Sequence, residues 1–309
     1  FGPHRPDVAQ HTFAGASAQV LDLIAAYTAD DPEVDQAAIA RNREAAVSML
    51  QRAAVLSLTQ DGAALRVRVI NETGHKLPTG HIEGRRVWIN VRFLDREGRL
   101  VREHGAYDDR TAELDASSTT VYEMHVGLSE AAATATGLQP GPTQHMALAD
   151  TIEKDNRIPP RGFTNAAFEA GGAPVVGASY ADGQYWDDVD FRVPPGAAAA
   201  RVSLYYQNTP KWYIDHLRDA NVTDSWGDRL HGLWEQTGRG APIRMAHASL
   251  DLRAVCHADW DSDGAVTALD YFAFLRDFFI GKGDFTLDGR TTAVDYWAYL
   301  RAWLDGCGR

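Results

Sequence analysis

The chain has 309 residues, a hydrophobic content of 45% and a formal net charge of −12, and this length is enough for one large and one small domain. The acidic balance argues against binding nucleic acid through a basic surface, and no apolar run approaches the roughly 20 residues that a membrane helix requires. The chain begins at Phe1 rather than Met and shows no signal peptide, which indicates a processed or truncated product.

Residues 1–60 form the first predicted unit, a helical segment. The stretches "ASAQVLDLIAAYTAD" and "DPEVDQAAIARNREAAVSMLQRAAVLSL" carry apolar residues at helical spacing. Asp31-Pro32 marks the start of the second helix, which we expect to be about 25 residues long.

Residues 61–252 form the second predicted unit, where the pattern changes to the alternation of β-strands. In "ALRVRVIN" the residues Leu65, Val67 and Val69 share one face, and "RRVWINVRFLD" alternates again. A tight turn then leads to "EGRLVREHG" as the return strand of a hairpin. "TTVYEMHVG" and "ARVSLYYQ" continue the pattern, "PKWYIDHLRDAN" predicts a helix, and "WGDRLHGLWEQTG" reads as irregular. Strands between long Pro- and Gly-rich loops predict an antiparallel sandwich.

Two loops of this unit are rich in side-chain oxygens. They contain Asp182, Asp187, Asp188 and Asp190 in one segment and Asp155 and Asn156 in another. Such loops could hold a further calcium ion, or they could be solvated carboxylates and turn caps. Three tryptophans, Trp88, Trp186 and Trp212, are candidates for stacking on sugar rings.

Residues 253–309 contain an acidic pattern that occurs twice at a spacing of 25 residues. Each copy has oxygen-bearing side chains at loop positions 1, 3 and 5, Gly at position 6 and a carboxylate at position 12, which is the arrangement of an EF-hand-like calcium loop. Position 7 supplies a backbone carbonyl. The expected ligands of two calcium ions are Asp259, Asp261, Asp263, the carbonyl of Ala265 and Asp270 in the first loop, and Asp284, Thr286, Asp288, the carbonyl of Arg290 and Asp295 in the second.

A short amphipathic helix is expected after each loop, in "LDYFAFLRDFF" and "VDYWAYLRAWL". Two loop-helix units about 25 residues apart resemble a type I dockerin, over residues 254–309. The alternative is a duplicated acidic turn without a metal. The pseudo-twofold arrangement of a dockerin implies that Cys256 and Cys307, which flank the repeat, form a disulfide, and two free thiols are the alternative.

A second resemblance covers residues 11 to about 250. Its residues are "HTFAGASAQVLDLI", "NETGHKLPTGHIEGRRVWINVRFLDREGRLVREHGAYD", "VYEMHVG", "KDNRIPPRGF", "YADGQYWDD" and "LYYQNTPKWYIDHLRDAN". These resemble the C-terminal, haem-free region of secreted bacterial multihaem c-type cytochromes. The chain has no Cys-x-x-Cys-His, so the resemblance implies haem c on an upstream segment or on a partner chain, with residues 1–60 packing on or leading from that region. It also implies His11 and His75 as haem axial ligands, and the alternative is loop histidines bonded to nearby carbonyls.

Together these patterns predict a mainly β chain with α-helices: N-terminal helices, an antiparallel β-sandwich with long loops, and a small α-helical dockerin-like calcium domain. No nucleophile elbow, phosphate loop or His-Glu-x-x-His motif is present, so no catalytic residue is predicted. A disulfide together with calcium argues for a secreted protein, extracellular or periplasmic.

We expect a non-catalytic module of a multihaem electron-transfer protein or complex. Its expected partners are a haem-bearing segment or cytochrome subunit and, through the dockerin-like domain, a cohesin-like protein or another copy of the chain. In the latter role the aromatic residues Tyr271, Phe274, Tyr296, Trp297 and Trp303 would form either a contact face or the core of the small domain. The alternative function is a calcium-dependent structural, adhesion or carbohydrate-binding protein without haem.

Overall fold

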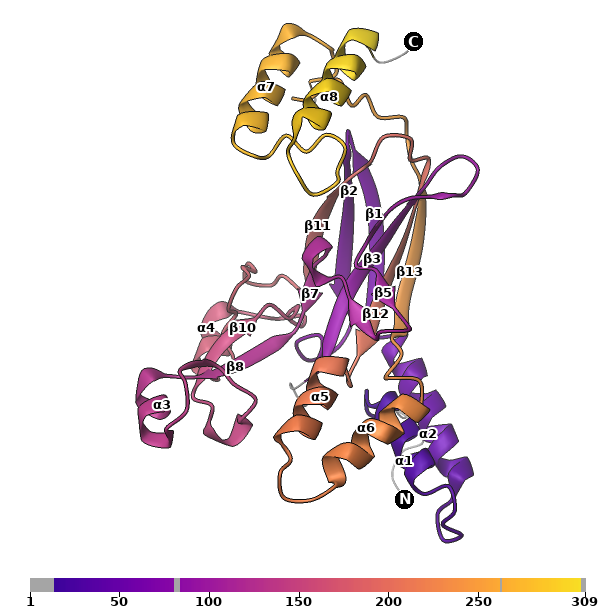
Figure 1. Cartoon of the computed structure of the whole chain (residues 1–309), viewed down its shortest axis with the longest axis vertical. Helices are drawn as coiled ribbons and strands as arrows, with labels where there is room; N and C mark the ends of the chain where they lie inside the picture. The colour runs from indigo at the N-terminus through magenta and orange to yellow at the C-terminus, as the bar shows by residue number, and fades with distance from the viewer. Residues whose placement is uncertain (1–13, 81–83, 262, 307–309) are drawn as a thin grey trace, which may run out of the picture.

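The computed structural model describes residues 14–80, 84–261 and 263–306. Two antiparallel sheets form a β-sandwich at the centre of the molecule, and helices gather at both ends (Figure 1). The first sheet has the order β1-β2-β11, formed by Ala54–Asp61, Ala64–Asn71 and Trp186–Arg192. The second has the order β13-β12-β3-β4, formed by Ile243–Asp251, Ala199–Gln207, Arg86–Leu94 and Leu100–His104, and β7 (Val121–Tyr122) also pairs with β3.

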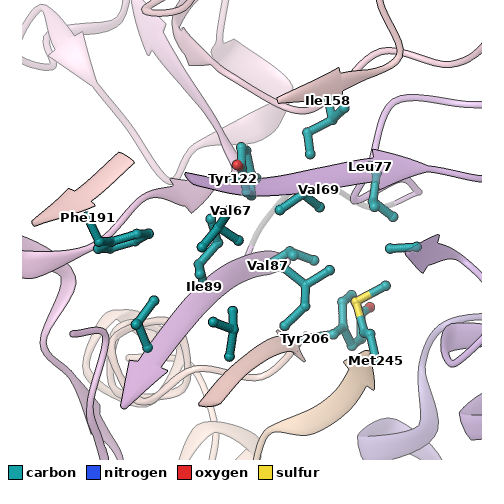
Figure 2. Close-up of a cluster of buried hydrophobic side chains, with 14 of the residues drawn as sticks. Val67, Val69, Leu77, Val87, Ile89, Tyr122, Ile158, Phe191, Tyr206 and Met245 are labelled. Atoms are coloured by element: carbon teal, nitrogen blue, oxygen red, sulfur yellow. The ribbon is translucent and has the colours of Figure 1, made fainter. Parts of the chain in front are cut away.

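The core of the sandwich lies between these two sheets. Figure 2 shows Val67 and Val69 of β2 beside Val87 and Ile89 of β3, and all four side chains are fully buried. Burying an aliphatic side chain of this kind stabilises the fold by roughly 1.5–3 kcal/mol. The alternation that the sequence shows in both strands is therefore the alternation between core and outer face, and the predicted mainly β fold is confirmed.

The outer face of the first sheet carries cross-strand ion pairs. Arg66 and Arg68 of β2 each bind a carboxylate of β11 through two hydrogen bonds, Arg66 with Asp190 at 2.8 Å and Arg68 with Asp188 at 2.7 Å. The strand register places Asp190 opposite Arg66 and Asp188 opposite Arg68. Opposite charges that lie directly across an antiparallel strand pair attract each other, so the strand register accounts for both ion pairs.

Two pairs of helices pack at one end of the sandwich (Figure 1). They are α1 (Ala18–Tyr27) with α2 (Gln36–Leu50), and α5 (Lys211–Ala220) with α6 (Trp226–Gln236). Leu23 of α1, Ile214 of α5 and Trp234 of α6 form one buried cluster, which joins the N-terminal helices to the later pair.

Two sequence predictions are wrong in this region. The second helix ends at Leu50, and the segment read as its last turns is strand β1. Each residue from Ala54 to Asp61 pairs with β2 across a tight turn at Gly62. The stretch read as irregular, "WGDRLHGLWEQTG", forms α6. Strand β13 also completes the second sheet after it.

A smaller sheet lies to one side of the sandwich (Figure 1). It has the order β10-β8-β9, from Thr151–Asp155, Met124–Leu128 and Gly141–Pro142, and carries α3 (Glu130–Thr136) and α4 (Asn165–Ala170) nearby. The remaining short elements are the β5–β6 hairpin, formed by Tyr107–Asp108 and Glu113–Leu114, and 3-10 turns at Ala116–Ser118 and Met146–Leu148.

The two C-terminal helices lie at the opposite end of the sandwich from the other helix pairs (Figure 1). They are α7 (Ala268–Phe279) and α8 (Ala293–Asp305). Each follows one of the acidic loops, as the sequence predicts, so the repeated pattern corresponds to a repeated loop-helix structure.

Candidate metal centre

Each acidic loop ends in a helix whose first turn is fixed by the carboxylate at loop position 12. At the start of α7 the Thr267 hydroxyl accepts from the backbone N–H of Leu269, and Asp270 accepts from the N–H of Thr267 at 2.7 Å. Thr292 and Asp295 repeat this arrangement at the start of α8. Such a capping box satisfies N–H groups that have no partner within the helix, so the helix start and the end of the loop are one structure.

In the first loop three carboxylates converge. Asp259, Asp261 and Asp263 each place an oxygen within 4.8 Å of the others. Asp259 accepts from the N–H of Asp263 at 3.0 Å and of Gly264 at 2.9 Å, and Gly264 adopts a left-handed φ of 92°. The glycine thus permits the turn that brings positions 1, 3 and 5 together.

Asp270, the expected ligand at position 12, lies outside that carboxylate group. It is fully buried and accepts hydrogen bonds from the backbone N–H groups of Trp260 at 2.7 Å and Asp261 at 3.2 Å. Burial acts to raise the pKa of Asp270, but hydrogen bonds from Thr267, Asp261 and Trp260 outweigh it and the pKa lies below its usual value. Asp270 therefore stays a carboxylate and ties the start of the loop to α7.

The second loop repeats this geometry with one difference. Here Asp284, Asp288 and Asp295 place oxygens within 4.8 Å of one another, so the position-12 carboxylate joins the group. Thr286 donates to Asp295 from both its N–H and its hydroxyl, each at 2.8 Å. Burial acts to raise the pKa of Asp295, and the hydrogen bonds from Thr286 and Thr292 outweigh it and hold the pKa at about 2.

The carboxylates of the first loop repel one another. Desolvation raises the pKa of Asp261, the backbone N–H of Asp263 opposes this by donating a hydrogen bond, and the charges of Asp263, Asp270 and Asp259 raise the pKa further. A cation among these oxygens would remove that repulsion. Ala265 and Arg290 occupy position 7 of the two loops and are exposed, and the ligand role of their carbonyls remains a prediction.

An aromatic cluster holds the two loop-helix units together. Phe274 of α7 stacks on Tyr299 of α8 with centroids 3.9 Å apart and planes 15° apart, and both are fully buried. Tyr299 donates to the carbonyl of Ala258 at 3.2 Å, and Trp303 donates to the carbonyl of Thr267 at 2.8 Å, so α8 is bonded to both ends of the first loop. Tyr271, Tyr296 and Trp303 pack against the same cluster.

Exposed apolar side chains recur at matching positions of α7 and α8. Of the five aromatic residues proposed from the sequence as a contact face, only Trp297 is exposed, at 65%. The exposed apolar residues include Leu269, Phe272 and Phe279 of α7 and, 25 residues later in each case, Val294, Trp297 and Leu304 of α8. We call these six residues the apolar helix face.

One contact between the sandwich and this unit is not visible in the sequence. Arg192, the last residue of β11, lies over the ring of Trp260 with 4.1 Å between the guanidinium carbon and the ring centroid. Burial lowers the pKa of Arg192 and the nearby charge of Asp284 opposes this. Such a cation–π contact is strengthened by the exclusion of water.

The two cysteines are only partly described by the structure. Cys256 is not a free thiol, and Cys307 lies outside the described residues. Their pairing with each other remains a prediction.

Of the two histidines expected to bind haem, His11 lies outside the described residues. His75 is exposed, and its backbone carbonyl accepts from Asn71 at 2.7 Å and from the Thr73 hydroxyl at 2.9 Å. Its ring makes no hydrogen bond to any described residue, whereas the alternative from the sequence was a ring bonded to nearby carbonyls. The ligand role of His75 remains a prediction.

The loop that carries His75 is anchored by a buried ion cluster. Lys76 donates to Asp155 at 2.7 Å and to the carbonyls of Ala173 and Pro174 at 2.9 Å, and Arg157 binds Asp155 through Nε at 2.7 Å. Burial lowers the pKa of Lys76 and the ion pair with Asp155 opposes this. Lys76 and Asp155 are 79 residues apart in the chain, so no local pattern reveals the contact.

The other oxygen-rich loops do not form a common metal site within the described residues. Asp188 and Asp190 bind arginines of β2, Asp155 binds Lys76 and Arg157, and Asp182 accepts from Asn165. Asp187 accepts from Tyr122 at 2.9 Å. Each of these carboxylates thus has a different partner, and the prediction of a further calcium ion there is not supported.

The sequence of the chain matches no family model and no curated protein. No helix among residues 14–80, 84–261 and 263–306 is both long and apolar enough to cross a membrane.

A penta-heme cytochrome c552 from Thermochromatium tepidum is similar in structure, with 16% identity and a TM-score of 0.40 over 67% of this chain. The match covers 41% of the cytochrome, so this chain spans less than half of it, and a similarity of this degree does not by itself establish a shared fold.

Proposed function

We propose that the C-terminal unit is a dockerin-like domain that binds two calcium ions. The observation that carries the proposal is the pair of carboxylate clusters, each within 4.8 Å, that recur at loop positions 25 residues apart. Calcium would be held by Asp259, Asp261, Asp263, Asp270 and the carbonyl of Ala265, and by Asp284, Thr286, Asp288, Asp295 and the carbonyl of Arg290. Bound calcium would neutralise the clustered carboxylates and so stabilise the loops.

The donor set favours calcium over other metals. Both clusters offer carboxylate oxygen atoms and contain no His or Cys. Soft or borderline metals prefer thiolate and imidazole ligands, and magnesium usually keeps several waters and demands near-ideal octahedral geometry. The second site has one carboxylate fewer, because Thr286 stands where the first loop has Asp261, and we expect it to bind calcium less tightly.

The apolar helix face is the proposed assembly surface of this unit. Six exposed apolar side chains at matching positions of α7 and α8 are more than isolated surface residues. We propose a cohesin-like partner or a second copy of the chain as what covers them. Both alternatives predict that assembly depends on calcium, because calcium orders the loops from which the two helices start.

For the sandwich we propose a non-catalytic role beside haem in a multihaem c-type electron-transfer protein or complex. The sequence motifs support this, and so does the exposed ring of His75 on an anchored loop. Haem c would be carried by an upstream segment or a partner chain, and its chemistry there would be electron transfer. His75 and His11 would supply axial imidazole nitrogens to it.

The sequence places the first boundary at residue 60, but strand β1 (Ala54–Asp61) belongs to the sandwich, so the helical segment ends before it. The proposed sandwich then runs to residue 252, and 253–309 is the proposed dockerin-like domain. We also propose a secreted location, extracellular or periplasmic, because calcium sites together with a Cys256–Cys307 disulfide would suit an oxidising compartment. A calcium-dependent structural or adhesion protein without haem is the alternative function, and it shares the C-terminal proposal.

Calorimetric titration of the calcium-free full chain tests the metal sites. Two binding events are expected; Asp259→Asn should weaken the first and Asp284→Asn the second, and Thr286→Asp should tighten the second. Asp305→Asn is the matched control, because it removes one exposed carboxylate of the same unit outside both loops. A chain that binds no calcium at millimolar concentration, or loop variants that bind like the control, would overturn the proposal.

Absorbance spectroscopy of the protein purified from its native source tests the role beside haem. A Soret band is expected in the native complex, and His75→Ala should shift it. His145→Ala is the control, because His145 is also an exposed loop histidine. Native material without haem or a haem-bearing partner would reject this role and leave the calcium proposal standing.

A further inference from the structure

The second sheet has a hollow on its outer face, away from the sandwich core. Strand β3 points Val87, Ile89 and Val91 into the core and therefore presents the intervening residues outward. These residues and their neighbours line a cavity of about 360 Å³, whose lining includes the aromatic residues Trp88, Tyr107 and Tyr205 and the polar residues Asn90, Arg92, Glu103 and Asp109. Its volume falls in the range of about 300–1,000 Å³ that is typical of small-molecule sites.

The base of this cavity is aromatic and rigid. Trp88 is fully buried, and its indole N–H donates to the carbonyl of Gly105 at 3.2 Å. Its ring lies 5.9 Å from that of Tyr107 and 5.6 Å from that of Tyr205, measured between centroids. Trp88 is thus not itself an exposed stacking surface, and the half-buried rings of Tyr107 and Tyr205 are the accessible apolar groups.

The wall of the cavity contains donors and acceptors that have unused hydrogen-bonding capacity. Asn90 is 5% exposed and its amide nitrogen donates to Glu103 at 2.8 Å, which fixes both side chains. No described residue donates to the amide oxygen of Asn90, and the side chains of Arg92 and Asp109 make no hydrogen bond to the described part of the chain. Arg92 and Glu103 are 3.7 Å apart, an ion pair that is too long for a good hydrogen bond.

We propose that this cavity binds a neutral saccharide. Each sugar hydroxyl both donates and accepts, so adjacent hydroxyls can bridge the donor-only guanidinium of Arg92 and the acceptor-only carboxylates of Glu103 and Asp109. The less polar face of the ring would lie on Tyr107 or Tyr205. This assignment does not rest on calcium, on haem or on the apolar helix face.

The charges of the cavity disfavour the main alternatives. Among the lining residues an anionic ligand would meet two carboxylates, Glu103 and Asp109, against one guanidinium, that of Arg92. A second guanidinium, that of Arg86, lies 5.4 Å from the centroid of the Trp88 ring, where it is buried. A quaternary ammonium ion would suit the aromatic rings, but it can neither donate nor accept a hydrogen bond. It would leave the amide oxygen of Asn90 without a hydrogen-bond donor, and the positive charge of Arg92 would repel it.

A glycan array of neutral plant and bacterial oligosaccharides, probed with the labelled full chain, tests the proposal first. The best-binding oligosaccharide is then titrated by calorimetry into the wild type and the variants Arg92→Ala and Asp109→Ala. Each variant should weaken binding about tenfold or more, because each loses hydrogen bonds to a charged group. Arg96→Ala, which removes an arginine from the exposed β3–β4 turn, is the matched control and should bind as the wild type does.

Circular dichroism of each variant establishes that it is folded, and Tyr205→Ala provides a further variant with no change in charge. Binding to the array followed by loss of affinity in the cavity variants alone supports the proposal. No binding on the array, equal affinity in all variants, or binding of choline chloride in place of saccharide would each overturn it.

Discussion

Removing the charge of Asp155 should destabilise the protein more than removing other paired carboxylates. The Asp155 side chain is 0% exposed and lies between Lys76, 5% exposed, and Arg157, 11% exposed. Asp155→Asn would leave these two buried cations without their shared counter-charge. Breaking a buried ion pair in this way costs about 3–5 kcal/mol, and for a unit the size of the sandwich this corresponds to a fall in Tm of roughly 6–20 °C.

The measurement is urea denaturation followed by tryptophan fluorescence at neutral pH, with Asp188→Asn as the matched control. Asp188 pairs with Arg68 at the surface, where their side chains are 29% and 43% exposed, so its loss should cost less than about 1 kcal/mol. Hydrogen exchange should also rise in residues 72–80, since Lys76 anchors that loop. If the two variants are equally stable, the buried cluster does not anchor the loop and the reasoning is refuted.

Three further outcomes are expected. Cys256→Ser should lower the free energy of unfolding by about 4 kcal/mol relative to the oxidised wild type, and equal stability of the two would exclude the predicted disulfide. The pKa of His257 is lowered from 6.5 to about 4 by burial and by Arg192. Stability should therefore fall as the pH drops from 6.5 towards 4, and His257→Asn should flatten this dependence of Tm on pH. Phe274→Ala should cost about 3–5 kcal/mol and Trp297→Ala less than about 0.5 kcal/mol, as measured by denaturation, and similar costs would contradict the separation of core from exposed face.

The parts of the fold that the sequence predicted are those with strong local patterns. The alternation in β2 and β3 marks side chains that are fully buried, such as Val67 and Ile89. The acidic repeat predicted both loops and the helices that follow, because each loop is closed by hydrogen bonds between residues close in sequence, as between Asp259 and Gly264. In the candidate metal centre, three of the expected carboxylates of each loop are brought together.

The parts that the sequence could not predict depend on contacts between distant residues. Strand β1 follows helix α2 after only a short turn. Its apolar residues are compatible with the spacing of a helix or of a strand, and only the pairing with β2 decides between them. The buried partners of Lys76, and the Asp188 and Asp190 partners of β2, come from segments far away in the chain. Three of the carboxylates that appeared free to bind a further metal, Asp155, Asp188 and Asp190, are therefore paired with lysine or arginine. The other two, Asp182 and Asp187, accept hydrogen bonds from Asn165 and Tyr122.

The contact between Arg192 and Trp260 has a mechanical consequence. Trp260 is at position 2 of the first loop. Its backbone N–H donates to Asp270 at the start of α7, and its ring packs on the rings of Phe274 and Tyr299. The guanidinium of Arg192, at the end of β11, lies over the same ring. A pulling force on α7 and α8 would thus reach the sheet through this ring as well as along the connecting chain. Trp260 is therefore a mechanical link between the end of β11 and the two C-terminal helices.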